Sequence, residues 1–172
     1  MDLAAYVREI PDFPREGISF KDITPLLADP EASAEALRLL VEHARGHDPE
    51  LVVGVEARGL ILGGALAHAL GVGFVPARKA GKLPAETVSV SYELEYGIDA
   101  LELHADAVWP GARVLLHDDL IATGGTAAAT VEAIERLGGE IVCCEFLVEL
   151  EFLGGRARLG DRDVLSLIAF AS

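Results

Sequence analysis

The stretch that most constrains the fold is Val114–Ala127, where an apolar run leads through two adjacent acids into a Thr-Gly-Gly-Thr turn and an alanine-rich segment. This order predicts a buried strand whose last residues enter a loop that opens a helix. Free N–H groups and the positive dipole end at a helix start suit a phosphate, and glycines let the backbone approach it closely. Because Asp118 and Asp119 would repel that phosphate, they indicate sugar hydroxyls or a divalent cation beside it. The predicted ligand therefore carries both a phosphate and a ribose.

Composition excludes several classes of protein. The chain has 172 residues, 51% of them hydrophobic, which suits one buried core and is inconsistent with disorder. A net charge of −14 argues against a nonspecific nucleic-acid partner. No apolar run reaches the roughly 18–20 residues of a membrane span, and the first residues lack the pattern of a signal peptide. We therefore expect a cytoplasmic protein with neither a membrane nor a nucleic-acid partner, in which the adjacent Cys143 and Cys144 are buried strand thiols.

Strand-like and helix-like patterns alternate along most of the chain. This alternation predicts an α/β fold with a mostly parallel central sheet flanked by helices, in a single domain spanning residues 1–172. Ligand sites in such sheets lie at the carboxyl ends of strands. Helical segments are expected at 2–8, 30–47, 60–70, 125–137 and 152–158, strands at 51–55, 72–77, 113–117, 140–149 and 163–169, and a hairpin-like excursion at 80–103.

The segment that begins at Val114 resembles the 5-phosphoribosyl-1-pyrophosphate (PRPP) signature of type I phosphoribosyltransferases, in which an apolar run precedes Asp-Asp and an Ala-Thr-Gly-Gly-Thr turn. It matches neither a Walker A loop nor a Gly-x-Gly-x-x-Gly fingerprint. The resemblance implies that Asp118 and Asp119 hold the ribose and, through water, Mg²⁺, with no direct protein ligand to the metal. His117 departs from the usual signature, and we interpret it as a packing residue. The 5′-phosphate would lie on Ala122, Thr123, Gly124, Gly125 and Thr126.

Two further loops carry cations. Arg58 follows the predicted strand 51–55, and a guanidinium in a tight turn suits an anion. The three lysines of the chain, Lys21, Lys79 and Lys82, all lie in motifs, which indicates a local cationic site in an acidic protein. The string Arg78–Pro84 resembles the Arg-Lys-x-Gly-Lys-Leu-Pro of the adenine-specific members of the family. The resemblance assigns pyrophosphate binding to Ala57, Arg58, Arg78, Lys79 and Lys82.

Two segments resemble the base-binding and catalytic parts of the same enzymes. Residues 12–27 resemble the N-terminal hood, which implies a hood over 1–30 in which Phe20 stacks on adenine while Ser19 and Lys21 flank it through backbone contacts. A core role for Phe20 remains the alternative. Residues 91–97 resemble the mobile catalytic loop, here within 80–103. In that loop Glu95 would relay the purine proton as the base nitrogen attacks, and Tyr96 would be the second functional residue, with Glu93 and Glu102 as solvated competitors.

The resemblance implies a purine-salvage enzyme, a homodimer, that converts adenine and PRPP into AMP and pyrophosphate with Mg²⁺. Arg58, Asp118, Asp119 and Glu95 would be its catalytic residues. Two alternatives remain open: a phosphoribosyltransferase for another purine base, and a PRPP-sensing regulator without catalysis. The first alternative would differ only in the residues that contact the base. The second would not need Arg58, Lys79, Lys82 or Glu95, because a regulator does not turn PRPP over.

Overall fold

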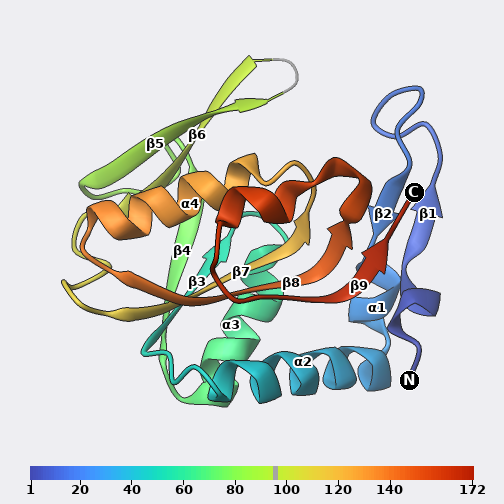
Figure 1. Cartoon of the computed structure of the whole chain (residues 1–172), viewed down its shortest axis with the longest axis horizontal. Coiled ribbons are helices and arrows are strands. Elements are labelled where there is room, and N and C mark those ends of the chain that lie inside the picture. Colours follow the sequence, from blue (N-terminus) through green and yellow to red (C-terminus); the bar gives the residue numbers. More distant parts are fainter. Residues whose placement is uncertain (95–96) are drawn as a thin grey trace.

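The central sheet is mostly parallel, as the alternating pattern predicts. The computed structural model describes residues 1–94 and 97–172, and in these residues the main sheet has the strand order β5-β6-β4-β3-β7-β8-β9. Strands β4, β3, β7, β8 and β9 run parallel, while β5 and β6 form an antiparallel hairpin at one edge (Figure 1). The predicted α/β class is confirmed. The strands are β3 Leu51–Val55, β4 Gly73–Lys79, β5 Thr87–Leu94, β6 Gly97–His104, β7 Arg113–Ile121, β8 Glu140–Leu150 and β9 Val164–Phe170.

Helices cover both faces of the sheet. Helices α2 (Pro30–Arg45) and α3 (Gly59–Leu70) pack on one face, and α4 (Gly125–Arg136) packs on the other (Figure 1). All of β3 is buried, as expected for a central parallel strand covered on both sides. Helix α2 begins where the carboxylate of Asp29 accepts hydrogen bonds from the backbone N–H groups of Glu31 and Ala32. None of the helices in the described residues is long and apolar enough to cross a membrane.

Strands β7 and β4 are longer than the sequence predicts. The expected strand 113–117 continues to Ile121, so Asp118 and Asp119 belong to β7 and do not follow it. The reason is that β8 is long enough to continue pairing with β7 as far as Ile121, which lies opposite Glu149. Within this pairing Asp118 and Asp119 are only 8% and 6% exposed. Strand β4 likewise extends to Lys79, two residues beyond the expected end.

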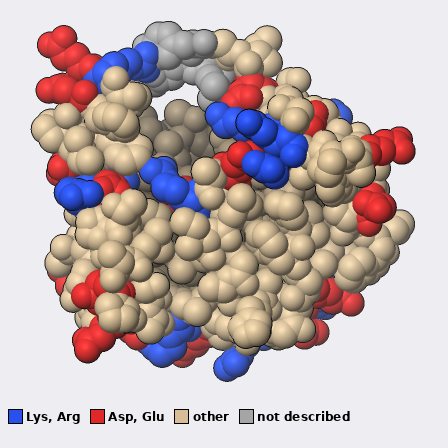
Figure 2. Space-filling model, turned by 180° about the vertical axis from the view of Figure 1, so that it is seen from behind, with Lys and Arg blue, Asp and Glu red and all other residues tan. Residues whose placement is uncertain are grey.

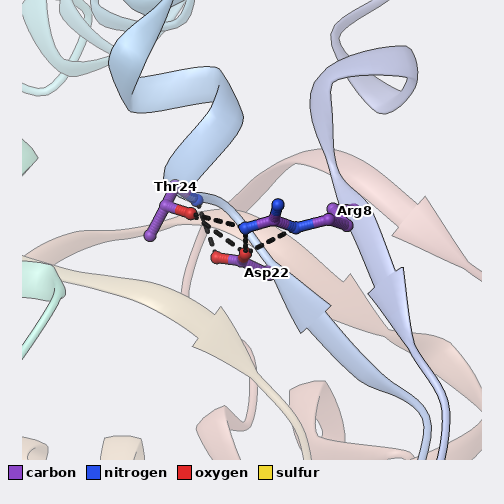
Figure 3. Close-up of polar contacts among 3 residues, drawn as sticks. All are labelled: Arg8, Asp22 and Thr24. Atoms are coloured by element: carbon purple, nitrogen blue, oxygen red, sulfur yellow. Dashed lines mark hydrogen bonds and ion pairs between the residues drawn. The ribbon is translucent and has the colours of Figure 1, made fainter.

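The N-terminal segment holds elements that the sequence analysis did not predict. They are β1 (Arg8–Ile10), β2 (Phe20–Asp22) and the short helix α1 (Thr24–Ala28), after the 3-10 turn η1 (Leu3–Tyr6). Arg8 donates to Asp22 from Nε at 3.0 Å and from Nη2 at 2.5 Å, and the Thr24 backbone N–H donates to the same carboxylate at 2.9 Å (Figure 3). These bonds, with that of Thr24 first, lower the pKa of Asp22 to about 2. One carboxylate therefore joins β1, β2 and the start of α1.

The expected excursion at 80–103 is largely the β5–β6 hairpin, whose register runs from Thr87 opposite His104 to Leu94 opposite Gly97. The hairpin lies over α4, and Arg136 of that helix donates to the Ser89 carbonyl oxygen at 3.2 Å (Figure 1). Glu95 and Tyr96, predicted to be functional, lie outside the described residues. Two further 3-10 turns, η2 (Glu151–Leu153) and η3 (Gly155–Leu159), connect β8 to β9.

Candidate active site

A cavity of about 550 Å³ lies at the carboxyl ends of β3, β4 and β7, where parallel sheets place their ligand sites. The β5–β6 hairpin contributes part of its wall. Figure 2 shows a hollow near the top of the rear face, with Lys and Arg side chains (blue) beside it. The cavity is lined by Glu56, Ala57, Arg58, Lys79, Tyr92, Asp99, Leu101 and Asp118 through Ala127. Most of the residues predicted to bind PRPP therefore line this one cavity.

The phosphate-type turn is built by a close approach of two backbone segments. Gly124 has φ +79° and stands at the N-cap of α4. A Cβ at Gly124 would collide with the carbonyl oxygen of Gly155 in η3, so only glycine fits there without a shift. The first residues of α4, whose N–H groups have no partner within the helix, line the cavity together with the turn. This arrangement suits a phosphate at the helix start.

The paired acids lie beside the guanidinium predicted to bind pyrophosphate. Arg58 Nε is 2.7 Å from Asp119 Oδ2. The neighbouring Asp118 accepts a hydrogen bond from the Asp119 backbone N–H at 2.8 Å. Burial, and then the charge of Asp119, raise the pKa of Asp118 well above its usual range. Ligands that bring positive charge or hydroxyl donors would therefore favour the ionised form of Asp118.

The two acids also fit a magnesium ion by their chemistry. They present carboxylate oxygens, which are hard donors, to an open cavity that a phosphorylated substrate could enter. Mg²⁺ is usually held by one or two carboxylates together with water and substrate phosphates. The residues present are consistent with that mode.

Other cations around the cavity are already paired with acids. Arg78 donates to Glu56 from Nη2 at 3.0 Å, and Glu56 also accepts from the Lys79 backbone N–H at 2.9 Å. Lys79 Nζ is 3.3 Å from Asp99 Oδ2 on β6. Arg78 first, and then the Lys79 N–H, lower the pKa of Glu56. When a polyanionic ligand binds, its oxygens would thus replace Glu56 and Asp99 as partners of Arg78 and Lys79.

The loop after β3 has an unusual backbone. The peptide bond between Glu56 and Ala57 is cis, and Glu56 N donates to the Ala77 carbonyl oxygen of β4 at 2.9 Å. Arg58 caps α3 directly after this bond. Ala57 and Arg58 both line the cavity.

The predicted hood residues lie outside the cavity lining but next to it. The Phe20 ring lies 5.0 Å from the guanidinium carbon of Arg58 and meets Phe13 edge to face at 5.2 Å. Lys21 is buried, with Nζ 2.9 Å from Glu9 Oε1 and 4.5 Å from the centre of the Phe170 ring. Its side chain is occupied by these groups. Ser19 also donates to Glu9.

The structure adds residues that the sequence analysis missed. Tyr92 and Asp99 line the cavity from the hairpin, and Tyr92 Oη donates to Asp99 Oδ2 at 3.3 Å. Arg158 of η3 places Nη1 3.8 Å from where a Cβ of Gly125 would stand. The sequence signal for Arg158 is the presence of two arginines, Arg156 and Arg158, in the short segment that forms η3. Arg78 and Lys82, by contrast, do not line the cavity, although Arg78 Nη1 donates to the Lys82 carbonyl oxygen at 3.3 Å.

His117, the departure from the family signature, lies in β7 among buried residues. Burial lowers its pKa to about 4, which keeps the ring neutral near pH 7. Its Cδ2 lies 3.6 Å from where a Cβ of Gly63 would stand on α3. It faces the helical layer as a packing residue would.

Comparisons with known proteins agree with this geometry. The model of the phosphoribosyl transferase domain matches residues 22–160. The adenine phosphoribosyltransferase of Desulfitobacterium hafniense is 55% identical over 99% of this chain and 98% of its own. The crystal structure of the adenine phosphoribosyltransferase of Thermoanaerobacter pseudethanolicus superposes with a TM-score of 0.95 at 52% identity, covering 98% of both chains. The Saccharomyces cerevisiae enzyme, complexed with an imino-altritol bisphosphate and adenine, gives a TM-score of 0.89 at 42% identity over 96% of both chains.

Proposed function

The chain belongs to the phosphoribosyl transferase family, and from that premise we propose that it transfers the 5-phosphoribosyl group of PRPP to adenine, giving AMP and pyrophosphate. One observation carries the proposal: the turn at the start of α4, the paired acids and Arg58 line the same cavity at the carboxyl ends of the strands. A phosphate, a ribose and a pyrophosphate each find suitable groups there. The enzyme therefore belongs to purine salvage.

The reaction breaks one bond and forms another at the same carbon. A ring nitrogen of adenine attacks C1′ of the ribose, and the bond from C1′ to the pyrophosphate oxygen breaks with its electron pair leaving on pyrophosphate. Positive charge develops on the sugar and negative charge on the leaving group. Asp118 and Asp119 stabilise the former and orient the ribose hydroxyls, while Arg58 and Lys79 stabilise the latter. We assign Arg78 and Lys82 to the same clamp, although neither side chain lines the cavity in this structure.

The 5′-phosphate does not react and serves to position the substrate. Backbone N–H groups of residues 122–126 and the Thr126 hydroxyl hold it at the start of α4. Its binding energy then places C1′ against the base without being lost in the reaction. Asp118 and Asp119 would hold Mg²⁺ through water when PRPP is bound, and the ion would supply positive charge that offsets the charge of pyrophosphate.

The base lies under the N-terminal hood, with Phe20 stacked on it and the backbone of Ser19 and Lys21 beside it. Because the Lys21 side chain contacts Glu9 and Phe170, only its backbone is left for the base. Glu95 relays the proton that the purine loses as its nitrogen attacks, and Tyr96 is the second functional residue of the catalytic loop. Closure of residues 80–103 excludes water from the activated sugar.

The assembly and location are part of the same proposal. We expect a homodimer, which analytical ultracentrifugation would detect as twice the mass of the chain. We also expect the protein to work in the cytoplasm. The free thiols of Cys143 and Cys144 fit such a reducing compartment.

The product of the purified protein tests the proposal. PRPP and Mg²⁺ are mixed with the protein and, separately, adenine, hypoxanthine, guanine or xanthine, and nucleotides are separated by chromatography. AMP from adenine alone is the expected result. A nucleotide from another base would overturn the hood assignment and leave the PRPP chemistry standing. Bound PRPP with no nucleotide from any base would instead favour the regulator.

A further inference from the structure

A second cluster of ligand-type side chains lies away from the cavity, between the end of α2 and the start of β8. His43 is in the last turn of α2 and His47 follows four residues later, while Cys143 comes from β8. One ligand atom from each of these three residues lies within 4.8 Å of the other two. Neither the phosphoribosyl reaction nor its cavity uses any of them.

Two carboxylates orient the histidines. His43 Nδ1 is 2.8 Å from Glu145 Oε1, so its other ring nitrogen, Nε2, turns toward Asp163 at 3.6 Å. His47 Nε2 is 3.0 Å from the same oxygen, Asp163 Oδ2. Both Nε2 atoms therefore converge on one point. A histidine whose Nδ1–H is held by a carboxylate and whose Nε2 is free has the arrangement that metal-binding histidines usually show.

A buried group in the cluster also lacks a partner. Cys143 and Glu145 are both fully buried at 0% exposure, and Glu145 Oε2 makes no hydrogen bond within the part of the chain that the structure describes. Buried polar oxygens normally find a donor or a cation, so a cation bound close to this acid would be favourable. Positive charge is also favoured there, because the C-terminal end of α2 carries the negative end of the helix dipole.

We propose that His43, His47 and Cys143 bind a zinc ion, with Asp163 as the fourth ligand and Glu145 orienting His43. Two imidazoles, a thiolate and a carboxylate are the donors that Zn²⁺ takes in tetrahedral sites, and a His-x-x-x-His spacing is common among them. The side chains of His43, His47 and Asp163 are 20%, 24% and 56% exposed, which leaves the ion a route from solvent. The site joins α2 to β8 and to the residue before β9, and it does not depend on the proposed function.

Cobalt provides the test, because a thiolate ligand gives Co²⁺ a charge-transfer absorption in the near ultraviolet. Protein stripped with a chelator is titrated with Co²⁺ in excess Mg²⁺, which occupies oxygen-only sites. We expect one equivalent to bind with that absorption and with the visible bands of tetrahedral cobalt, and Zn²⁺ to abolish both. Zinc should also raise the melting temperature, since it binds the folded state.

Adjacent cysteines give a matched pair of variants. Cys143→Ser should remove the charge-transfer band, whereas Cys144→Ser should keep it, because Cys144 is buried in the core on the other face of the sheet. His47→Gln, at a partly exposed position, should weaken Co²⁺ binding by about 10-fold or more while circular dichroism shows a folded chain. If Cys143→Ser does not fold, the Co²⁺ affinity of His47→Gln tests the proposal instead. Saturating Co²⁺ without a thiolate band in the wild type, or wild-type affinity in His47→Gln, would overturn the proposal.

Discussion

Arg58 Nε lies 2.7 Å from Asp119 Oδ2, so the cation predicted for pyrophosphate and an acid predicted for ribose form one ion pair. Both side chains are largely withdrawn from solvent, at 34% and 9% exposure. When PRPP binds, the ion pair between Arg58 and Asp119 must therefore give way to contacts of Arg58 with pyrophosphate and of Asp119 with the ribose. The pair holds each group near its place before substrate arrives.

Removal of either partner should impair the chemical step. We expect Arg58→Ala and Asp119→Asn each to lower kcat/KM for PRPP by about 10²–10³-fold, the usual cost of losing one group that stabilises transition-state charge. Steady-state kinetics measures this, and circular dichroism should show a folded chain. Arg38→Ala is the control, because Arg38 pairs with Glu35 and Glu42 on the surface of α2. Normal turnover in either active-site variant would contradict these roles.

A methyl group at Gly124 should damage phosphate binding specifically. Gly124→Ala would force its Cβ against the Gly155 carbonyl and displace the turn, raising KM for PRPP by at least 10-fold. Gly71→Ala separates this effect from backbone strain, because Gly71 also has a positive φ, +73°, with nothing within 4 Å of an added Cβ. It should cost about 1 kcal/mol of stability and leave KM unchanged. Equal KM values in the two variants would rule out the close approach as the cause.

The hood should act on the base and not on PRPP. Phe20→Leu removes stacking worth about 1–3 kcal/mol and should raise KM for adenine by about 10-fold, with KM for PRPP nearly unchanged. Trp109→Leu is the comparison. Trp109 is a half-exposed aromatic residue that precedes the amino end of β7, whereas the cavity lies at the carboxyl ends of the strands. If Phe20→Leu changes stability but neither KM, Phe20 is a packing residue.

The strands are predictable from sequence where burial decides them, as in the continuous apolar run of β3. The ends of β4 and β7 are not, because polar residues such as Asp118 stay in a strand when a neighbouring strand supplies the ladder. The ion pair of Lys79 with Asp99 was equally beyond prediction, since it depends on the register of β6 against β4. Motifs predicted most of the groups that line the cavity, but the partners that neutralise them come from tertiary structure.

Acid should selectively weaken the N-terminal segment. The folded pKa of Asp22 is about 2, below the ordinary 3.8, so its ionised form stabilises the fold above pH 4, and this contribution disappears as pH falls toward 2. We expect Asp22→Asn to lower the free energy of unfolding at pH 6 by about 1 kcal/mol, since Arg8 is exposed and screened. Urea titrations of both proteins at several pH values measure the gap. A gap that widens below pH 4 would contradict the assigned cause.

The most direct test of the proposed site is a crystal structure of the protein with AMP and pyrophosphate. We predict the nucleotide phosphate on the N–H groups of residues 122–126, the ribose hydroxyls on Asp118 and Asp119, and the base against Phe20. Pyrophosphate should contact Arg58, released from Asp119. AMP bound outside this cavity, or with its phosphate and base exchanged, would contradict the proposed site.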